Sequence, residues 1–300
     1  MTLNDRRLAQ FVDRTREMER FCGMLKDRRK LIMVVTGETG SGKSSLIARM
    51  THECSVQTLR KTEVVWTDTR NYNYLALMRK IRDDLGANYF ANFTTLVNAF
   101  YDPTMKVELT ITSTGAVTVG SGMQVSPGGQ VGNITGINVE QAVVRDCMFV
   151  DPRGDREIPE EERRTRLTDQ FLEDFSGMPE SSTIVMFFDA VEKMTSETRA
   201  WIWDELMMAI CDGRLKNVCA VHCGQVKPSI SNDLRSMIED AALGPLGITD
   251  IEEYLVKREA PCPMSAIGEV AKMIFAFSKG QPIAVANAVD SYIELSRSAA

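Results

Sequence analysis

The stretch Gly37–Ser44, GETGSGKS, constrains the fold of this chain more than any other feature. It matches the pattern G-x-x-x-x-G-K-[ST], follows the apolar run Leu31–Val35 and precedes a helical pattern that extends to Met50. In this context of strand, turn and helix, the glycines let successive backbone N–H groups point at phosphate oxygens. We expect Lys43 to reach the β and γ phosphates, and the Ser44 hydroxyl to hold Mg²⁺. The sequence therefore predicts a P-loop that binds a nucleoside triphosphate.

The predicted phosphate site extends from this loop into the first turn of the helix that follows it. The N-terminal end of a helix carries a partial positive charge, which attracts an anion. The residues predicted to contact the nucleotide here are Gly37, Thr39, Gly40, Ser41, Gly42, Lys43, Ser44 and Ser45.

A second apolar run, Val185 to Phe188, ends on the carboxylate of Asp189. In a P-loop protein, an acid at the end of a buried strand holds Mg²⁺, directly or through water; capping a following helix is the alternative role. Glu192 follows three residues later and is the nearest carboxylate that could polarise an attacking water, if the chain turns tightly after the strand. Its alternative role is that of an exposed glutamate at the start of a helix. Glu192 and Lys43 are the predicted catalytic residues.

Short apolar runs alternate with helical patterns over most of the chain, which predicts a parallel α/β sheet covered on both faces. Beyond about Leu243 only helical patterns follow. We therefore expect a P-loop nucleotide-binding domain over residues 1–242 and a helical lid subdomain over residues 243–300. The predicted strands are Leu31–Val35, Glu63–Thr67, Thr183–Phe188 and Asn217–His222, and the predicted helices include Tyr74–Leu85, Thr165–Phe175, Trp201–Ile210, Thr249–Arg258, Ala266–Phe277 and Pro282–Ser296.

One segment breaks the α/β pattern. Residues Leu109–Val139 contain no charged residue and hold seven of the twenty glycines. Val117/Val119 and Met123/Val125 alternate with small polar residues, which predicts a β-hairpin with glycine-rich turns. We interpret residues 104–145, approximately, as an insertion in the P-loop domain. Three interpretations stay open: a flexible loop, a β-module packed on its own domain, or an assembly element, because a strand edge without Lys or Glu lacks the usual protection against pairing.

The composition limits the environment of the protein. The 300 residues are 44% hydrophobic and 25% charged, so the chain can bury a sizeable core. The net charge of −6 disfavours nonspecific binding to nucleic acid, and nothing in the sequence indicates such a partner. Seven cysteines form no disulfide pattern, no run is long enough to span a membrane and the N-terminus has no apolar signal core. We expect a cytoplasmic protein without a membrane partner.

Four segments in order resemble the STAND class of P-loop signalling ATPases, which are related to AAA+, NACHT and NB-ARC proteins. Phe11–Met18 is similar to the N-terminal segment of that class, but Asp13 stands at the position where the class usually has glycine. The P-loop follows, and then Phe188–Glu192, in which the second acid comes three residues after the first. The last segment, Gly280–Pro282, resembles a Gly-x-Pro motif of the helical subdomain.

The resemblance implies an AAA+-like core that binds ATP and Mg²⁺. It implies that Phe11, Val12 and Arg14 lie beside the adenine and that Pro282 packs near the nucleotide. It also supports Glu192 as the residue that polarises water, although many AAA+ proteins place that acid at the position of Ala190 here.

A further departure from the pattern of this class is at the end of the fourth predicted strand. Its members often end the fourth strand with an arginine that senses the γ-phosphate, whereas here the strand leads to Gln225. A neutral amide senses charge far less strongly than a guanidinium. We expect slow hydrolysis, or an arginine supplied by a neighbouring subunit, with Gln225 lying at the nucleotide.

The function implied by the resemblance is a nucleotide-controlled switch or assembly platform in bacterial signalling or antiviral defence. Proteins of this class usually carry an effector domain, and we expect here an effector encoded separately, self-association, or both. Two alternatives stay open. One is a DNA-associated AAA+ loader or initiator, and the other is a structural subunit that holds ATP without hydrolysing it.

Overall fold

The computed structural model describes residues 8–67, 72–101, 117–119, 123–125, 159–180 and 183–298. The chain divides into two compact units, Met1–Tyr89 with Ser176–Ala300, and Phe90–Phe175. The first unit contains a five-stranded parallel sheet with the strand order β2-β5-β6-β1-β7. The strands are β1 (Ile32–Thr36), β2 (Arg60–Val65), β5 (Ile184–Asp189), β6 (Val218–Gly224) and β7 (Ile238–Ala242).

Each face of the sheet buries alternate residues of the central strands. On one face, α2 (Thr15–Asp27) and α3 (Lys43–Val56) contribute to a core with side chains from β1, β5 and β6. On the other face, Trp203 of the π-helical stretch η4 (Trp201–Met207) packs against His222 of β6. The strands are buried because both faces are covered, as in other parallel sheets.

Further elements belong to the sheet part of the first unit. They are α4 (Tyr74–Leu85), the short turn η3 (Val191–Lys193), and the helices α7 (Ser196–Ala200), α8 (Met208–Cys211) and α9 (Asn232–Arg235). The short turn η1 (Ala87–Phe90) includes the boundary between the two units. In this sheet all strands run parallel, so their carboxyl ends lie together at one end of the sheet. The P-loop follows β1, Asp189 is the last residue of β5 and Gln225 follows β6, so all three are brought to that end of the sheet.

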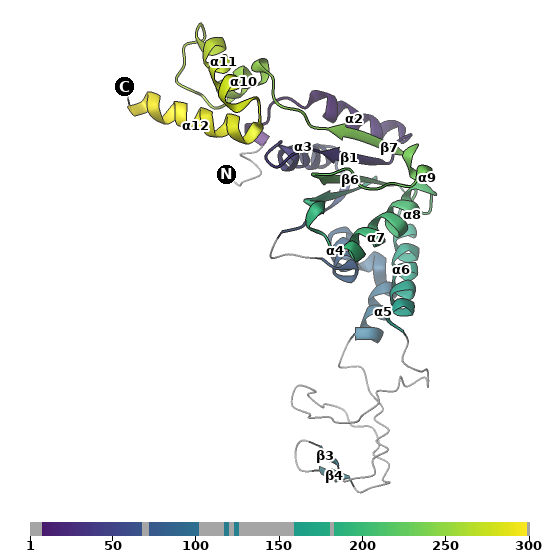
Figure 1. Ribbon diagram of the computed structural model, residues 1–300. Coiled ribbons are helices and arrows are strands. Elements are labelled where there is room, and N and C mark those ends of the chain that lie inside the picture. Colours follow the sequence, from purple (N-terminus) through teal and green to yellow (C-terminus); the bar gives the residue numbers. More distant parts are fainter. Residues whose placement is uncertain are drawn as a thin grey trace. The chain divides into compact units, whose positions relative to one another are not determined.

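The C-terminal part of the first unit is helical, as the sequence predicts. It contains α10 (Ile248–Lys257), α11 (Ile267–Ser278) and α12 (Pro282–Ser298), which lie together as a group (Figure 1). These helices share a second hydrophobic core, which also takes in Val12 and Leu246. A boundary at residue 243, between a P-loop domain and a lid, stays a prediction.

The second unit contains α5 (Ala91–Tyr101) and α6 (Glu160–Ser176). Rings of both helices pack together, with the centroids of Phe93 and Phe171 5.3 Å apart. Within the predicted insertion, β3 (Val117–Val119) and β4 (Met123–Val125) form an antiparallel pair in which Val117 lies opposite Val125 and Val119 lies opposite Met123. The other residues of the insertion lie outside the described part of the chain.

The fold class predicted from the sequence is confirmed: an α/β P-loop core with C-terminal helices. The edge strand β7 and helix α5 have no counterpart among the predicted elements. Over the described residues, none of the helices combines the length and the apolar character that crossing a membrane requires.

Candidate functional site

The phosphate loop connects β1 to α3 at the carboxyl edge of the sheet. Gly40 (φ 81°) and Gly42 (φ 91°) adopt left-handed conformations that cost glycine nothing. Gly42 is the N-cap of α3 and, as a glycine, has no side chain with which to cap the helix. Lys43 Nζ donates to the carbonyls of Gly37 and Glu38, at 2.8 Å each. The loop therefore leads directly into the N-terminus of α3, and Lys43 lies beside that N-terminus. This is the sequence of strand, turn and helix that the P-loop pattern predicts.

Asp189, at the end of β5, lies directly beside the phosphate loop. Ser44 Oγ donates to Asp189 Oδ2 over 2.7 Å, although the two residues are 145 positions apart. The other carboxylate oxygen of Asp189 accepts from the backbone N–H of Ala190 at 2.8 Å. Asp189 is 5% exposed, so its carboxylate is held in a fixed orientation. The two predicted metal ligands are thus brought into contact.

A tight turn after β5 places Glu192 near the carboxyl ends of the strands. Ala190 adopts the left-handed conformation (φ 57°) and is followed by the single 3₁₀ turn η3. This is the tight turn that a role for Glu192 requires, and it holds the glutamate next to the end of β6. There Gln225 Nε2 donates to Glu192 Oε1 at 3.0 Å. Both side chains are exposed.

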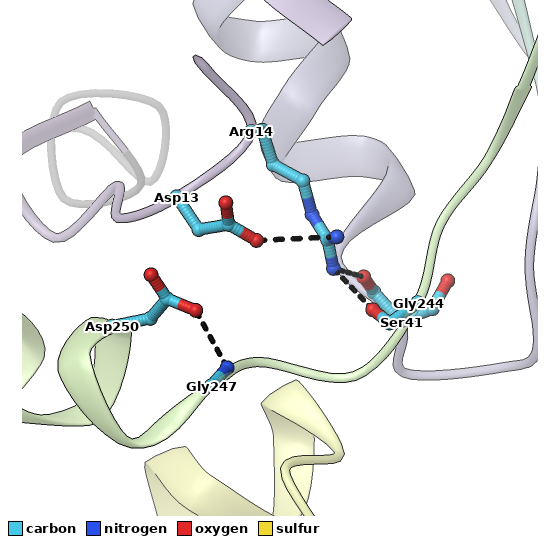
Figure 2. A network of polar contacts seen from close by, with 6 residues as sticks. All are labelled: Asp13, Arg14, Ser41, Gly244, Gly247 and Asp250. Carbon is cyan, nitrogen blue, oxygen red and sulfur yellow. Dashed lines mark hydrogen bonds and ion pairs between the residues drawn. The ribbon is translucent and has the colours of Figure 1, made fainter. Parts of the chain in front are cut away.

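Arg14 reaches the phosphate loop from the N-terminal segment (Figure 2). Arg14 is 6% exposed, and its Nη2 donates to the carbonyls of Ser41, at 3.2 Å, and Gly244, at 2.7 Å. Asp13 pairs with Nη1 at 3.3 Å. Val12 lies in the core of the C-terminal helices, and Phe11 packs at the edge of the sheet core. Contact of Phe11, Val12 and Arg14 with an adenine stays a prediction.

The start of α12 also lies on the phosphate loop. A β-carbon built at Gly42 would lie 3.9 Å from Cγ of Pro282, so the predicted proline does lie beside the loop. Two residues that the sequence did not single out are closer. Gln281 Nε2 donates to the Thr39 carbonyl at 3.3 Å, and the backbone N–H of Ile283 donates to the Gly40 carbonyl at 3.2 Å. The sequence signal that could have indicated these contacts is Pro282, which lies between the two residues at the first position of α12.

Two titratable side chains of β6 are buried close to the site. Burial, followed by the charge of Arg199, lowers the pKa of His222 to about 3, so the imidazole is neutral. Burial, followed by the neighbouring Asp189 carboxylate, raises the pKa of the Cys223 thiol well above its usual value. A thiol that stays protonated is a poor nucleophile. Neither group is therefore suited to act as a base or a nucleophile here.

The donor set fits a nucleotide with Mg²⁺. A hydroxyl and a carboxylate in contact are the oxygen ligands that Mg²⁺ prefers. Ser41 Oγ is buried and finds no hydrogen-bond partner within the described part of the chain. A buried polar atom of this kind is stabilised by a polar ligand. Ser44 and Asp189 could hold the metal, and the loop could hold the phosphates.

A family model matches the part of the chain that contains the phosphate loop, Asp189 and Glu192. The family model described as "AAA ATPase domain" matches residues 10–207, which is more than half of the chain. A comparison with curated proteins finds no match.

Solved structures that match this chain share little sequence with it. One is a STAND protein with a tetratricopeptide repeat sensor from Pyrococcus horikoshii (13% identity, TM-score 0.42, covering 92% of this chain and 29% of that one). Another is Cdc6p from Pyrobaculum aerophilum (12% identity, TM-score 0.43, covering 92% and 61%). A third is the HORMA:CdnC:Trip13 complex of E. coli MS115-1 (10% identity, TM-score 0.45, covering 91% and 77%). The chain thus spans less than two thirds of the first and second of these proteins.

The AAA+-related P-loop class that the sequence predicts is confirmed by the match over residues 10–207. The chain belongs to the AAA ATPase domain family.

Proposed function

We propose that this protein binds ATP with Mg²⁺ at the P-loop, hydrolyses it slowly, and uses the bound nucleotide as a switch. The observation that carries the proposal is the 2.7 Å contact between Ser44 Oγ and Asp189 Oδ2. That contact brings a hydroxyl and a buried carboxylate together next to Lys43, which is the set of side chains that a P-loop ATPase needs.

In this proposal the phosphates bind the N-terminus of α3, where the first backbone N–H groups have no intrahelical acceptor. Lys43 leaves the carbonyls of Gly37 and Glu38 and donates to the β and γ phosphates. Ser44 and Asp189 hold Mg²⁺, which supplies Lewis-acid stabilisation of the phosphate charge.

Glu192 orients the attacking water and accepts its proton. As the water oxygen bonds to the γ-phosphorus, the bond from that phosphorus to the bridging oxygen breaks, and ADP leaves with the bonding electrons. Gln225 holds one oxygen of Glu192, which leaves the other free for the water. Because Gln225 is neutral, it stabilises the charge that develops on the phosphate less than an arginine would, and this supports slow turnover.

Phosphate release by the wild type, Lys43→Ala and Glu192→Gln tests these roles. We expect slow release from the wild type, no ATP binding by Lys43→Ala, and ATP binding without turnover by Glu192→Gln. A carboxylate base contributes about 10²- to 10⁴-fold, so the loss at Glu192 should be of that order. Hydrolysis by Glu192→Gln at the wild-type rate would show that the base is assigned to the wrong residue.

The narrower role is a switch for assembly in bacterial signalling or antiviral defence, working with a separately encoded effector. The order of the motifs from Phe11 to Pro282, which resembles the STAND class, supports it. A nuclease, protease or NADase encoded next to this gene would support the effector further. Mass measured in solution with and without ATP, on the wild type and on a deletion of residues 109–139, tests assembly. An unchanged mass in both proteins would count against it.

The alternative of a DNA-associated loader predicts DNA binding that weakens steeply with salt, because phosphate contacts release counterions. The net charge of −6 speaks against it. Titration of double-stranded and single-stranded DNA at low and moderate salt separates the two functions.

A further inference from the structure

Gly224, the last residue of β6, contacts both the start of the phosphate loop and the turn that carries Glu192. In the sheet it lies opposite Thr36, the residue directly before the loop. Its carbonyl accepts from the backbone N–H of Gly37, the first residue of the loop, at 3.2 Å. The backbone of Gly224 is therefore fixed to the point where the phosphate loop begins.

The missing side chain of Gly224 leaves room for the short turn η3. A β-carbon added at Gly224 would lie 2.5 Å from Cγ2 of Val191 and 3.4 Å from Oε2 of Glu192. Carbon atoms in contact normally lie about 3.5 to 4.0 Å apart, so any side chain at position 224 would overlap Val191. Val191 is 5% exposed and fills this space itself.

The requirement for glycine at this position is one of space and not of backbone conformation. Gly40 and Gly42 have a positive φ, whereas Gly224 does not, and it ends a regular strand. An alanine can therefore adopt the same backbone conformation. Replacing Gly224 with alanine acts only through the methyl group that it adds.

Val191 and Glu192 are neighbours in one closed turn. Its backbone hydrogen bonds run from the N–H of Lys193 to the Ala190 carbonyl, at 3.0 Å, and from the N–H of Met194 to the Val191 carbonyl, at 3.2 Å. Because these bonds hold the turn together, a group that displaces Val191 also displaces Glu192.

We propose that Gly224 is a positioning residue, which sets the place of Glu192 relative to the phosphate loop by leaving room for Val191. The inference rests on the proposed function, in which Glu192 orients the attacking water. Oε2 is the oxygen left for that water, because Gln225 holds Oε1. The base must be aligned with the bound phosphates, and a misplacement of about 1 Å can lower a rate about 100-fold. Gly224 fixes this alignment because it contacts both the loop and the turn.

Phosphate release in a single turnover, with Mg²⁺ and with the protein in excess over ATP, tests the inference in Gly224→Ala. Relief of the 2.5 Å approach requires a shift of about 1 Å, so we expect the rate of the chemical step to fall about 10- to 100-fold. The affinity for ATP in calorimetry should change by less than about threefold, because the phosphate contacts belong to the loop.

A second substitution provides the matched rescue. In Gly224→Ala/Val191→Ala the atom Cγ2 is removed, and the new methyl group would lie 3.9 Å from the β-carbon of residue 191. This is an ordinary contact, so the double variant should hydrolyse ATP within about threefold of the rate of Val191→Ala alone. Gly23→Ala is the control, because a β-carbon there would meet no atom of the described residues within 4 Å. Its rate should equal that of the wild type.

Hydrogen exchange in the protein without nucleotide reports on the turn independently of hydrolysis. In Gly224→Ala the amides of Lys193 and Met194 should exchange faster by about fivefold or more, as expected when a methyl group is inserted into a packed site. The double variant should exchange these amides at the rate of Val191→Ala alone.

The outcomes separate the inference from the proposed function. A wild type that binds no ATP, or binds it without releasing phosphate, contradicts the proposed function. Equal amide exchange of the turn in the wild type and Gly224→Ala overturns the inference, whether or not the wild type hydrolyses ATP. If the wild type hydrolyses ATP, an unchanged rate in Gly224→Ala overturns the inference and leaves the proposed function standing. A slow Gly224→Ala that the second substitution does not restore overturns it as well, because the loss then has another cause than contact with Val191.

Discussion

At the scale of single residues, the hydrogen bond from Gln225 to Glu192 is the contact that most affects the proposed reaction. It holds Oε1 of the carboxylate at 3.0 Å, and both side chains are exposed. A hydrogen bond of this kind contributes about 0.5 to 1.5 kcal/mol, because water competes for both partners. Gln225 is therefore a positioning residue, and its effect on rate should be moderate.

We predict that Gln225→Ala lowers kcat by about three- to tenfold and leaves KM for ATP nearly unchanged, because the variant loses orientation of Glu192 rather than phosphate contacts. Steady-state phosphate release measures both constants. Gln225→Asn retains an amide on a shorter side chain, so its kcat should lie between that of the wild type and that of Gln225→Ala. A large rise in KM with unchanged kcat would instead indicate that Gln225 binds the nucleotide directly.

His222 makes the stability of the fold depend on pH. Its pKa of about 3 in the folded state lies below the ordinary value of 6.5, with burial as the main cause and Arg199 as the second. The unfolded chain therefore binds more protons between these values. The contribution of His222 to stability is complete above about pH 6.5 and is lost as the pH falls towards 3.

We predict that His222→Leu makes the free energy of unfolding less dependent on pH. Between pH 6 and pH 4 its slope should be smaller than that of the wild type by about 1.4 kcal/mol per pH unit. Urea unfolding at a series of pH values measures it. The matched control is His52→Leu, at the other histidine of the chain, which is exposed on α3. Equal slopes for the wild type and His222→Leu would show that His222 is accessible to protons in the folded state.

At the scale of secondary-structure elements, the buried carboxylate of Asp174 joins α6 to the start of α5. It accepts from the backbone N–H of Phe93 at 2.8 Å and from the side-chain amides of Asn92 and Gln170 at 3.1 Å each. The N–H of Phe93 lies in the first turn of its helix, where no intrahelical acceptor exists. Asp174 therefore caps α5 from a neighbouring helix, inside the aromatic core of the second unit.

We predict that Asp174→Ala destabilises the protein by about 1 to 3 kcal/mol, because it leaves the buried N–H of Phe93 without an acceptor. Chemical denaturation followed by circular dichroism measures the change. Asp169→Ala, at an exposed position of the same helix, should change stability by less than about 0.5 kcal/mol. Equal stability of the two variants would exclude the capping role.

The elements also show what the sequence could and could not predict. The P-loop and the strand that ends at Asp189 were predictable, because a buried strand gives a continuous apolar run and the loop needs glycines at fixed spacing. The strand β7 was not, because as an edge strand it is only partly buried and its sequence IEDAA carries two acids. The contacts of Gln281 and Ile283 with the loop were not predictable either. They join the side-chain amide of Gln281 and the backbone N–H of Ile283 to carbonyls more than 240 residues away along the chain, and no local pattern encodes them.

At the scale of the whole molecule, the site belongs to one of the two compact units, which contains the sheet and helices α10–α12. A nucleotide bound to the folded form alone stabilises that unit by mass action, by about 2.7 kcal/mol when its concentration is 100 times Kd. Stabilisation of this kind reports binding even if hydrolysis is slow, so it separates a switch that holds ATP from a protein that does not bind it.

Calorimetric titration of ATP into the wild type, once with Mg²⁺ and once with EDTA, is the direct test of nucleotide binding at the P-loop. We predict saturable binding that weakens in EDTA, because Ser44 and Asp189 then hold no metal. We also predict that binding is lost in Lys43→Ala, which removes the ammonium group that reaches the phosphates. Absence of binding to the wild type at millimolar ATP, or equal binding by Lys43→Ala, would contradict the claim that this loop is a nucleotide site.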